Sequence, residues 1–204
     1  MKKPGFILFS LFAFCFLILS CSRHNYTVPE GEHYPKPLLK PLPLKIGVYY
    51  NDDFRKYEST YYVSEYASHN IRLGKANIAL FDYILPHVFE EVTPVQHLSE
   101  ANEDMGNFDI ILEPSITSYS CNLDHIRGWE VKCQVDITYA ITFYSLNSMQ
   151  LGTWSINAEG FASGGWAPNI DATQSAMRDL AAQFMTGICK DMATKELFDK
   201  HCNK

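Results

Sequence analysis

The stretch that decides the fold is EVKCQVDITYAITFY, residues 130–144. Apolar side chains occupy every second position, and polar side chains occupy all but one of the positions between them. Because side chains alternate between the two faces of a strand, the pattern predicts a long antiparallel strand with one face on the core. The apolar positions are Val131, Cys133, Val135, Ile137, Tyr139, Ile141 and Phe143. Ordinary strands have about 5–6 residues, so we expect this one to bend or to extend past its neighbours.

The residues that follow predict a hairpin and then a helix. LNSMQ at 146–150 is typical of a turn, and residues 151–161 are the expected return strand. A glycine-rich loop over 163–169 leads to a helix expected from about Asp171 to Ala193, because apolar residues recur four apart there. The sequence therefore places a helix directly after two paired strands.

The residues upstream predict further strands and one more helix. Ile78, Phe81 and Leu85 begin an apolar stripe with helical spacing in residues 73–92, and Pro86 is expected to kink or end that helix. The tyrosine-rich residues 54–72 predict either a short strand pair or a long loop. The remaining expected strands are 44–50, 92–97, 108–112 and a continuation from Ile116 after a bulge near Pro114.

These elements predict an α/β fold of the α+β type. We expect a two-layer sandwich in which a mainly antiparallel sheet of four to six strands carries two helices on one face. The alternation over 130–144 leaves the other face polar, so that face is either solvated or in contact with a partner. The domain is expected to span residues 44–198, and the charged residues 199–204 are expected to form a frayed tail.

The first 20 residues have the features of an export signal. Lys2 and Lys3 precede an apolar run of 14 residues from Phe6 to Leu19, which is short for a membrane-spanning helix. The run ends in Ile18-Leu19-Ser20-Cys21, which resembles the lipobox of bacterial lipoproteins. The resemblance implies cleavage between Ser20 and Cys21, lipidation of Cys21, and a stable hold on a membrane through several acyl chains. Two alternatives stay open: an uncut N-terminal anchor helix, and ordinary secretory cleavage close to Cys21.

Residues 21–43 are expected to tether the domain to this lipid. The stretch contains Pro29, Pro35, Pro37, Pro41 and Pro43, and proline removes backbone donors and fixes φ. We therefore predict an extended spacer, with a proline-rich ligand for a partner as the alternative. Since Ser22 rather than Asp follows Cys21, the lipoprotein resemblance implies the outer membrane, with the domain facing the periplasm.

Four cysteines follow Cys21, and an even number in an exported chain indicates disulfides. Three pairings are open, and we favour Cys121–Cys133 and Cys189–Cys202 because both are local. The second pairing requires the last helix to end before Cys202, since 13 helical residues would separate the two by roughly 20 Å. A metal site at Cys121, His125 and Cys133 is the alternative, but the spacing matches no tetrahedral zinc motif.

The sequence contains no motif that indicates catalysis, a metal or a cofactor. A serine elbow, a metalloprotease helix, a P-loop and a dinucleotide fingerprint are all absent from the sequence. Removal of residues 1–20 changes the formal net charge from −6 to −8, which disfavours nucleic acid as a partner. We therefore expect a non-enzymatic protein.

Two features of the sequence are candidates for binding. Tyr57, Tyr61 and Tyr62 belong to the tyrosine-rich stretch, and Trp166 lies in the glycine-rich loop. Tyrosine and tryptophan are favoured at interfaces because they combine apolar rings with polar groups. The alternative is that half of these side chains pack into the core.

The layout of lipobox, tether, strand, helix, strands and helix resembles that of small outer-membrane lipoproteins that serve export and assembly machines. Examples are the lipopolysaccharide-assembly lipoprotein of the outer-membrane translocon and the ring-forming lipoproteins of curli or exopolysaccharide secretion. The resemblance lies in architecture, so Cys21 is the one residue whose role carries over. It implies a lipid-anchored periplasmic protein that docks on an envelope partner. A lipoprotein that binds a glycan or small ligand and an envelope hydrolase are the other hypotheses.

Overall fold

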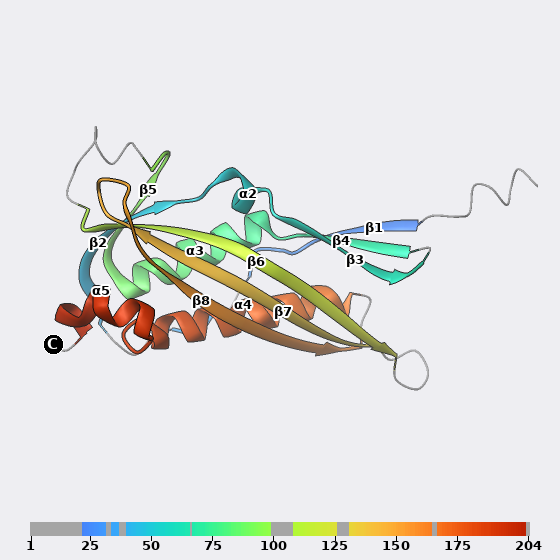
Figure 1. Ribbon diagram of the computed structural model, residues 1–204. Coiled ribbons are helices and arrows are strands. Elements are labelled where there is room, and N and C mark those ends of the chain that lie inside the picture. Colours follow the sequence, from blue (N-terminus) through green and yellow to red (C-terminus); the bar gives the residue numbers. More distant parts are fainter. Residues whose placement is uncertain are drawn as a thin grey trace, which may run out of the picture.

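A computed structural model describes residues 22–31, 34–36, 40–65, 67–98, 108–125, 131–164 and 167–202, which form an elongated molecule (Figure 1). The elements in chain order are β1 (Ser22–Thr27), β2 (Leu42–Tyr49), α2 (Asp52–Arg55), β3 (Glu58–Ser64), β4 (Ala67–Arg72), α3 (Gly74–Val88), β5 (Phe89–Val95), β6 (Ile110–His125), β7 (Val131–Tyr144), β8 (Gln150–Ser163), α4 (Pro168–Gly187) and α5 (Met192–Cys202). The predicted α+β class is confirmed.

The larger sheet has five strands in the order β5–β2–β6–β7–β8. β7 is antiparallel to β6 and β8, and every second residue from Cys133 to Phe143 is buried, which confirms the predicted strand. The long antiparallel pairings of β6, β7 and β8 make up most of the sheet, as expected, and β2 adds parallel pairings with both β5 and β6. Parallel pairs need crossover connections, and α3 lies within the crossover from β2 to β5. The expected interruption near Pro114 is wrong, because β6 runs through Pro114, which pairs with Ile141. A register shift occurs later, between Ile116 and Ser118.

The two long helices cover one face of this sheet, as the sequence predicts (Figure 1). Leu80, Phe81 and Ile84 of α3 and Leu180 and Phe184 of α4 are fully buried in a core shared with β7. α3 ends at Val88, two residues after Pro86, and the chain continues directly into β5. Pro86 thus lies in the last turn of α3, and the helix ends shortly after this residue, which cannot donate a backbone hydrogen bond.

Gly160 sets the distance between α4 and β8. A Cβ added at this glycine would collide with the backbone of Ala172 and Ala176 in α4. Side chains of α4 also reach the free edge of β8: the backbone N–H of Glu159 donates to Asp179 at 3.0 Å, and Gln183 donates to the carbonyl of Asn157 at 2.8 Å. These contacts occupy part of an edge that would otherwise be open to another strand.

A second sheet of three strands has the order β1–β4–β3 and lies at one end of the molecule (Figure 1). The strand pair expected in the tyrosine-rich stretch is present as β3 and β4. The expected spacer over 21–43 is wrong for its first part, because residues 22–27 form β1, and Val28 and Tyr34 are buried in the core. The prolines lie after β1, so they do not prevent an edge strand at its start.

The C-terminal region also differs from the prediction. The last long helix ends at Gly187, and a turn leads into α5, which packs Phe198 into the core. The expected frayed tail over 199–204 is wrong for residues 199–202, which belong to α5. The predicted Cys189–Cys202 disulfide is confirmed, and its formation depends on the break between the two helices.

Candidate functional site

The most informative part of the surface is the end of the three-stranded sheet at which the chain enters it. β1 is parallel to β4, and Ser22 is the partner of Ala67. Ala67 directly follows the turn that joins β3 to β4, and it also pairs with Ser64. The first residue after the predicted lipidation position Cys21 is therefore level with the tip of the β3–β4 hairpin. Cys21 and Ser20 lie outside the described residues.

The candidate tyrosines do not form one surface. Tyr57 and Tyr61 are half-buried, and Tyr57 packs against the core. Tyr62 has the opposite orientation on β3 and is 80% exposed. Trp166 lies outside the described residues. Tyr62 therefore faces away from Tyr61, because adjacent residues of a strand face opposite ways. Binding through these side chains stays a prediction.

The outward face of the hairpin tip carries a row of residues across all three strands. Arg23 of β1 pairs with Ser68 of β4, which pairs with Tyr62 of β3. Val63, the next residue, is also exposed. Below this row, the buried side chain of Asn70 donates to Glu58 at 2.9 Å and Asn25 at 3.3 Å and accepts from Thr60 at 3.1 Å. The three strands are thus joined on their outward face by one polar side chain.

The inward face of the same sheet carries a cluster of rings around His69. His24 and Tyr61 are its strand partners, and their ring centroids lie 5.5 Å and 5.3 Å from that of His69. The Tyr61 hydroxyl also lies 3.1 Å from His69 Nδ1, and Tyr26 packs against the ring. Partial burial, reinforced by the nearby His24, lowers the pKa of His69. The sequence gives no sign of this cluster, because residue 24 lies in the stretch that is expected to form a spacer.

The predicted Cys121–Cys133 pair lies where the three-stranded sheet meets β6. The two sulfurs are 3.1 Å apart, and Tyr61 lies beside Cys121. The structure does not contain the bond, and both residues are thiols. The hydrogen bond between the two thiols lowers the pKa of Cys121 and raises that of Cys133. The disulfide itself stays a prediction, although the strands hold the two sulfurs next to each other.

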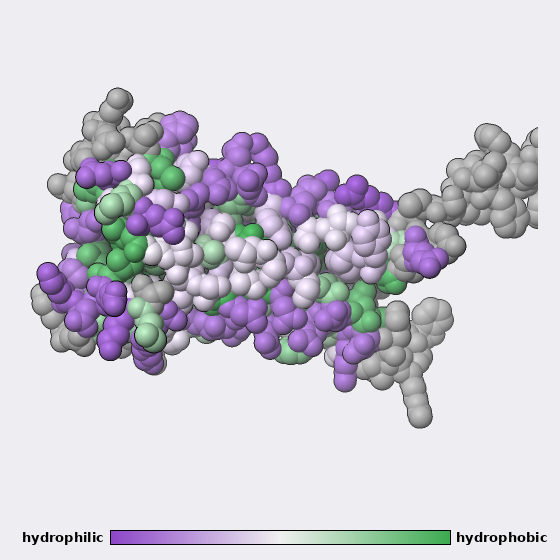
Figure 2. All heavy atoms as spheres, in the orientation of Figure 1, coloured by the Kyte–Doolittle hydropathy of each residue, from purple (hydrophilic) through white to green (hydrophobic). Residues whose placement is uncertain are grey.

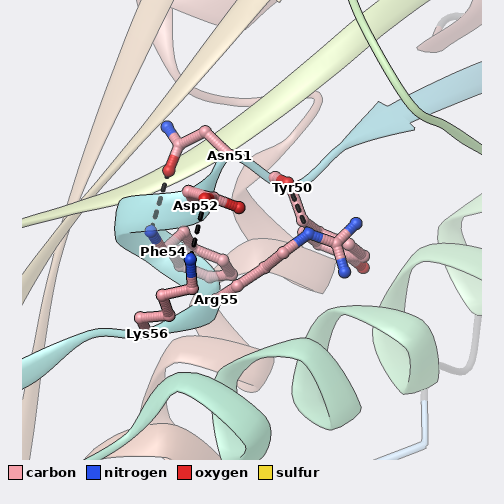
Figure 3. A network of polar contacts seen from close by, with 6 residues as sticks. All are labelled: Tyr50, Asn51, Asp52, Phe54, Arg55 and Lys56. Atoms are coloured by element: carbon pink, nitrogen blue, oxygen red, sulfur yellow. Dashed lines mark hydrogen bonds and ion pairs between the residues drawn. The ribbon is translucent and has the colours of Figure 1, made fainter.

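A compact polar network fixes the connection between the two sheets (Figure 3). The side chain of Asn51 accepts a hydrogen bond from the backbone N–H of Phe54 at 2.8 Å and so caps α2. Arg55 donates to the carbonyl of Tyr50 at 2.7 Å and lies over its ring, while Lys56 pairs with Asp52. Phe54 is buried against Phe81 of α3. This one-turn helix therefore anchors the start of β3 to the core.

The uncovered face of β6, β7 and β8 is lined mainly by short polar side chains. Ser118 donates to Thr138 at 2.8 Å, Thr138 donates to Asn157 at 3.3 Å, and Thr142 and Thr153 are in contact. Figure 2 shows this face as a broad pale area between hydrophilic margins. At the end of these strands that lies toward the three-stranded sheet, a groove of about 430 Å³ is lined by Asn122, Asp124, Lys132, Gln134, Phe161 and their neighbours.

In the part of the chain that the structure describes, no three His, Cys, Asp or Glu side chains are grouped so that they would hold a metal ion. None of the described helices combines the length and the apolar character that crossing a bilayer requires.

Comparisons with known proteins identify a similar fold but no family. No family model matches the sequence, and no curated protein matches it. A crystal structure of a Xanthomonas campestris protein assigned to the family model DUF330 has a TM-score of 0.50 and 9% identity, and covers 88% of this chain and 99% of that one. A minor lipoprotein from Acinetobacter baumannii has a TM-score of 0.39 and 9% identity, with 72% and 92% covered. At 9% identity the first likeness shows the fold alone, and the second likeness, with its TM-score of 0.39, supports no argument.

Proposed function

We propose that this protein is a bacterial envelope lipoprotein, anchored to the outer membrane through Cys21, with its domain in the periplasm. The observation that carries the proposal is the N-terminal sequence, in which a basic start and a 14-residue apolar run end in Ile18-Leu19-Ser20-Cys21. The start of β1 at Ser22 fits this assignment, because Ser22 directly follows the proposed lipidation site Cys21 and is the first residue of β1.

We further propose that the domain acts by docking on an envelope protein of an assembly or export machine, without catalysing a reaction. The support is the polar face of β6–β8, which the described helices leave uncovered. Its side chains already bond to one another, as Ser118, Thr138 and Asn157 do, so the face presents a preorganised surface. A partner that binds there displaces water without having to order long side chains.

Membrane fractionation of cells that carry the full chain tests the anchor. We expect the parent protein in the outer-membrane fraction and the Cys21→Ser variant in the signal-peptide-bearing precursor form, because the lipid precedes cleavage in this class. A Ser22→Thr variant is the matched control, since it leaves the cysteine in place. Cleavage of Cys21→Ser to the parent size would indicate ordinary secretion and contradict the proposal.

Photo-cross-linking in living cells tests the docking role. A photo-reactive amino acid at Asn157, on the uncovered face, is expected to give a discrete adduct with one envelope protein. The same amino acid at Met192, which is 87% exposed on α5, serves as the control. Adducts of equal yield at both positions, or none at Asn157, would contradict docking through this face.

The groove beside Phe161 supports a second candidate function, the binding of a glycan or small ligand. Its volume of about 430 Å³ lies within the usual size range of ligand sites, and Phe161 is 62% exposed beside it. Chemical-shift changes confined to Gln134, Phe161 and their neighbours on addition of envelope glycans would favour this function over docking. Turnover of an envelope substrate by the purified chain would contradict both.

A further inference from the structure

We propose that the tip of the β3–β4 hairpin, defined as Arg23, Tyr62, Val63 and Ser68, touches the membrane leaflet that holds the lipid. The inference rests on the proposed lipidation of Cys21. It adds a second, protein-mediated membrane contact to the anchor and thereby sets the orientation of the domain.

The strand register provides the first argument. Ser22 pairs with Ala67, the first residue after the hairpin turn. Neighbouring strands are about 4.8 Å apart, so Ser22, which is bonded directly to the proposed lipidation site, lies beside Ala67. An acylated Cys21 enters the leaflet at the level of the lipid headgroups. The hairpin tip cannot be far from that level, because no spacer separates it from the anchor.

The side chains at the tip provide the second argument. Tyr62 is 80% exposed and Val63 37%, which places both among the exposed hydrophobic side chains of the described chain. Tyrosine is enriched at membrane interfaces because its ring enters the headgroup region while its hydroxyl stays hydrated. Arg23 lies in the same row as Tyr62, with only the small Ser68 between them, so its guanidinium can meet lipid phosphates. The acidic Glu65 is exposed in the turn. Because anionic lipid repels a carboxylate, Glu65 opposes deep insertion of the tip, and the contact is expected to be shallow.

The position of the tip in the molecule provides the third argument. Tyr61 contacts Cys121, which pairs with Val135, whereas the β7–β8 turn follows Tyr144. Nine residues of strand separate these two levels, a distance of about 30 Å. The β7–β8 turn, which contains the exposed Met149, therefore lies far from the hairpin tip. Figure 1 shows the turn between β7 and β8 at the opposite end of the molecule from β3 and β4. A tip held at the membrane turns the β7–β8 turn and α5 away from it.

Depth-dependent quenching on the lipidated full chain tests the proposal. A solvatochromic fluorescent amino acid replaces either Tyr62 or, as matched control, Met149, which is 63% exposed in another hairpin turn. The protein is reconstituted through its own lipid in vesicles of phosphatidylethanolamine and phosphatidylglycerol that contain shallow spin-labelled lipid. We expect a blue-shifted label at position 62, quenched at least about twofold more than the label at position 149. Arg23→Glu is expected to reduce the quenching at position 62 by about half.

The possible outcomes distinguish a failure of the tip contact from a failure of the lipid anchor. A label at position 62 that stays as water-exposed as the label at position 149, on a chain that floats with the vesicles, overturns the inference and leaves the lipoprotein assignment intact. A chain that does not float and whose Cys21 is unmodified overturns both. Because both replaced side chains are exposed, circular dichroism is expected to show unchanged folding in both labelled variants.

Discussion

The two sheets of this protein contain similar strands but are stabilised in different ways. The five-stranded sheet buries a continuous apolar face under α3 and α4, and residues such as Ile137 and Tyr139 are fully buried. The three-stranded sheet is narrower and is joined on its outward face by the polar side chain of Asn70. Apolar burial is distributed over many contacts, whereas a polar network depends on each member. The first sheet is therefore expected to control global stability and the second to open locally.

The largest effect is expected from Gly160→Val in the five-stranded sheet. The added side chain collides with the backbone of α4, so helix and sheet must separate. We expect a loss of about 3 kcal/mol or more in the free energy of unfolding, measured by urea denaturation. Gly47→Ala is the control, because the nearest atoms to its added Cβ are 3.4 Å away, and it is expected to cost less than about 1 kcal/mol. Equal losses in the two variants would contradict the assigned role of Gly160.

The next effect concerns Cys121 and Cys133, at the junction of the two sheets. In an oxidising compartment we expect these thiols to form a disulfide, because the strands already hold their sulfurs 3.1 Å apart. Closing this short loop is expected to stabilise the protein by about 2–3 kcal/mol relative to the Cys121→Ser, Cys133→Ser double variant. Thiol titration of the denatured periplasmic protein measures the bond directly. Two reactive thiols, mapped to these positions, would show that the pair stays reduced.

A smaller and local effect is expected from Asn70→Ala in the three-stranded sheet. The change removes the buried side chain to which Glu58, Thr60 and Asn25 all bond. The expected loss in the free energy of unfolding is about 1–3 kcal/mol. Hydrogen exchange is expected to accelerate in β1, β3 and β4 while β7 keeps its protection. The control is Asn157→Ala, an exposed side chain on the other sheet. Equal acceleration in β7 would mean that the two sheets unfold as one unit.

The smallest effect is the pH dependence contributed by His69. Partial burial and His24 lower the pKa of His69 in the folded protein below its ordinary value of 6.5. The unfolded chain therefore binds the proton more readily, and stability falls as the pH decreases below 6.5 until the folded pKa is reached. We expect His69→Asn to flatten the stability profile in that window, measured by thermal unfolding between pH 7 and pH 5 (~two units around the ordinary value). An unchanged slope of stability against pH would mean that a group other than His69 causes the pH dependence.

The same contrast explains how much of the fold could be predicted. The alternation over 130–144 and the helical stripe from Ile78 to Leu85 are repeated signals, and the structure contains both elements. β1 has six residues, lies beside a proline-rich stretch, and pairs with a strand 45 residues away. No local pattern indicates such a pairing, because it depends on long-range packing. The break at Ile188 was missed for a related reason, since the apolar spacing continues through it.

The candidate site was predicted less completely than the fold. The tyrosines at 57, 61 and 62 were grouped by composition, but strand alternation places Tyr62 outward and Tyr61 inward. His24 and His69 become neighbours only through the parallel pairing of β1 and β4. The Cys189–Cys202 bond was predicted correctly because sequence proximity alone favours it.

Mass spectrometry of the N-terminal peptide from membrane-extracted protein tests the lipoprotein account most directly. The account predicts a peptide that starts at Cys21 and carries a thioether-linked diacylglycerol and an acylated amine, so that the anchor is covalently next to β1. A peptide that retains residues 1–20, or one that starts near Cys21 with an unmodified cysteine, would contradict it.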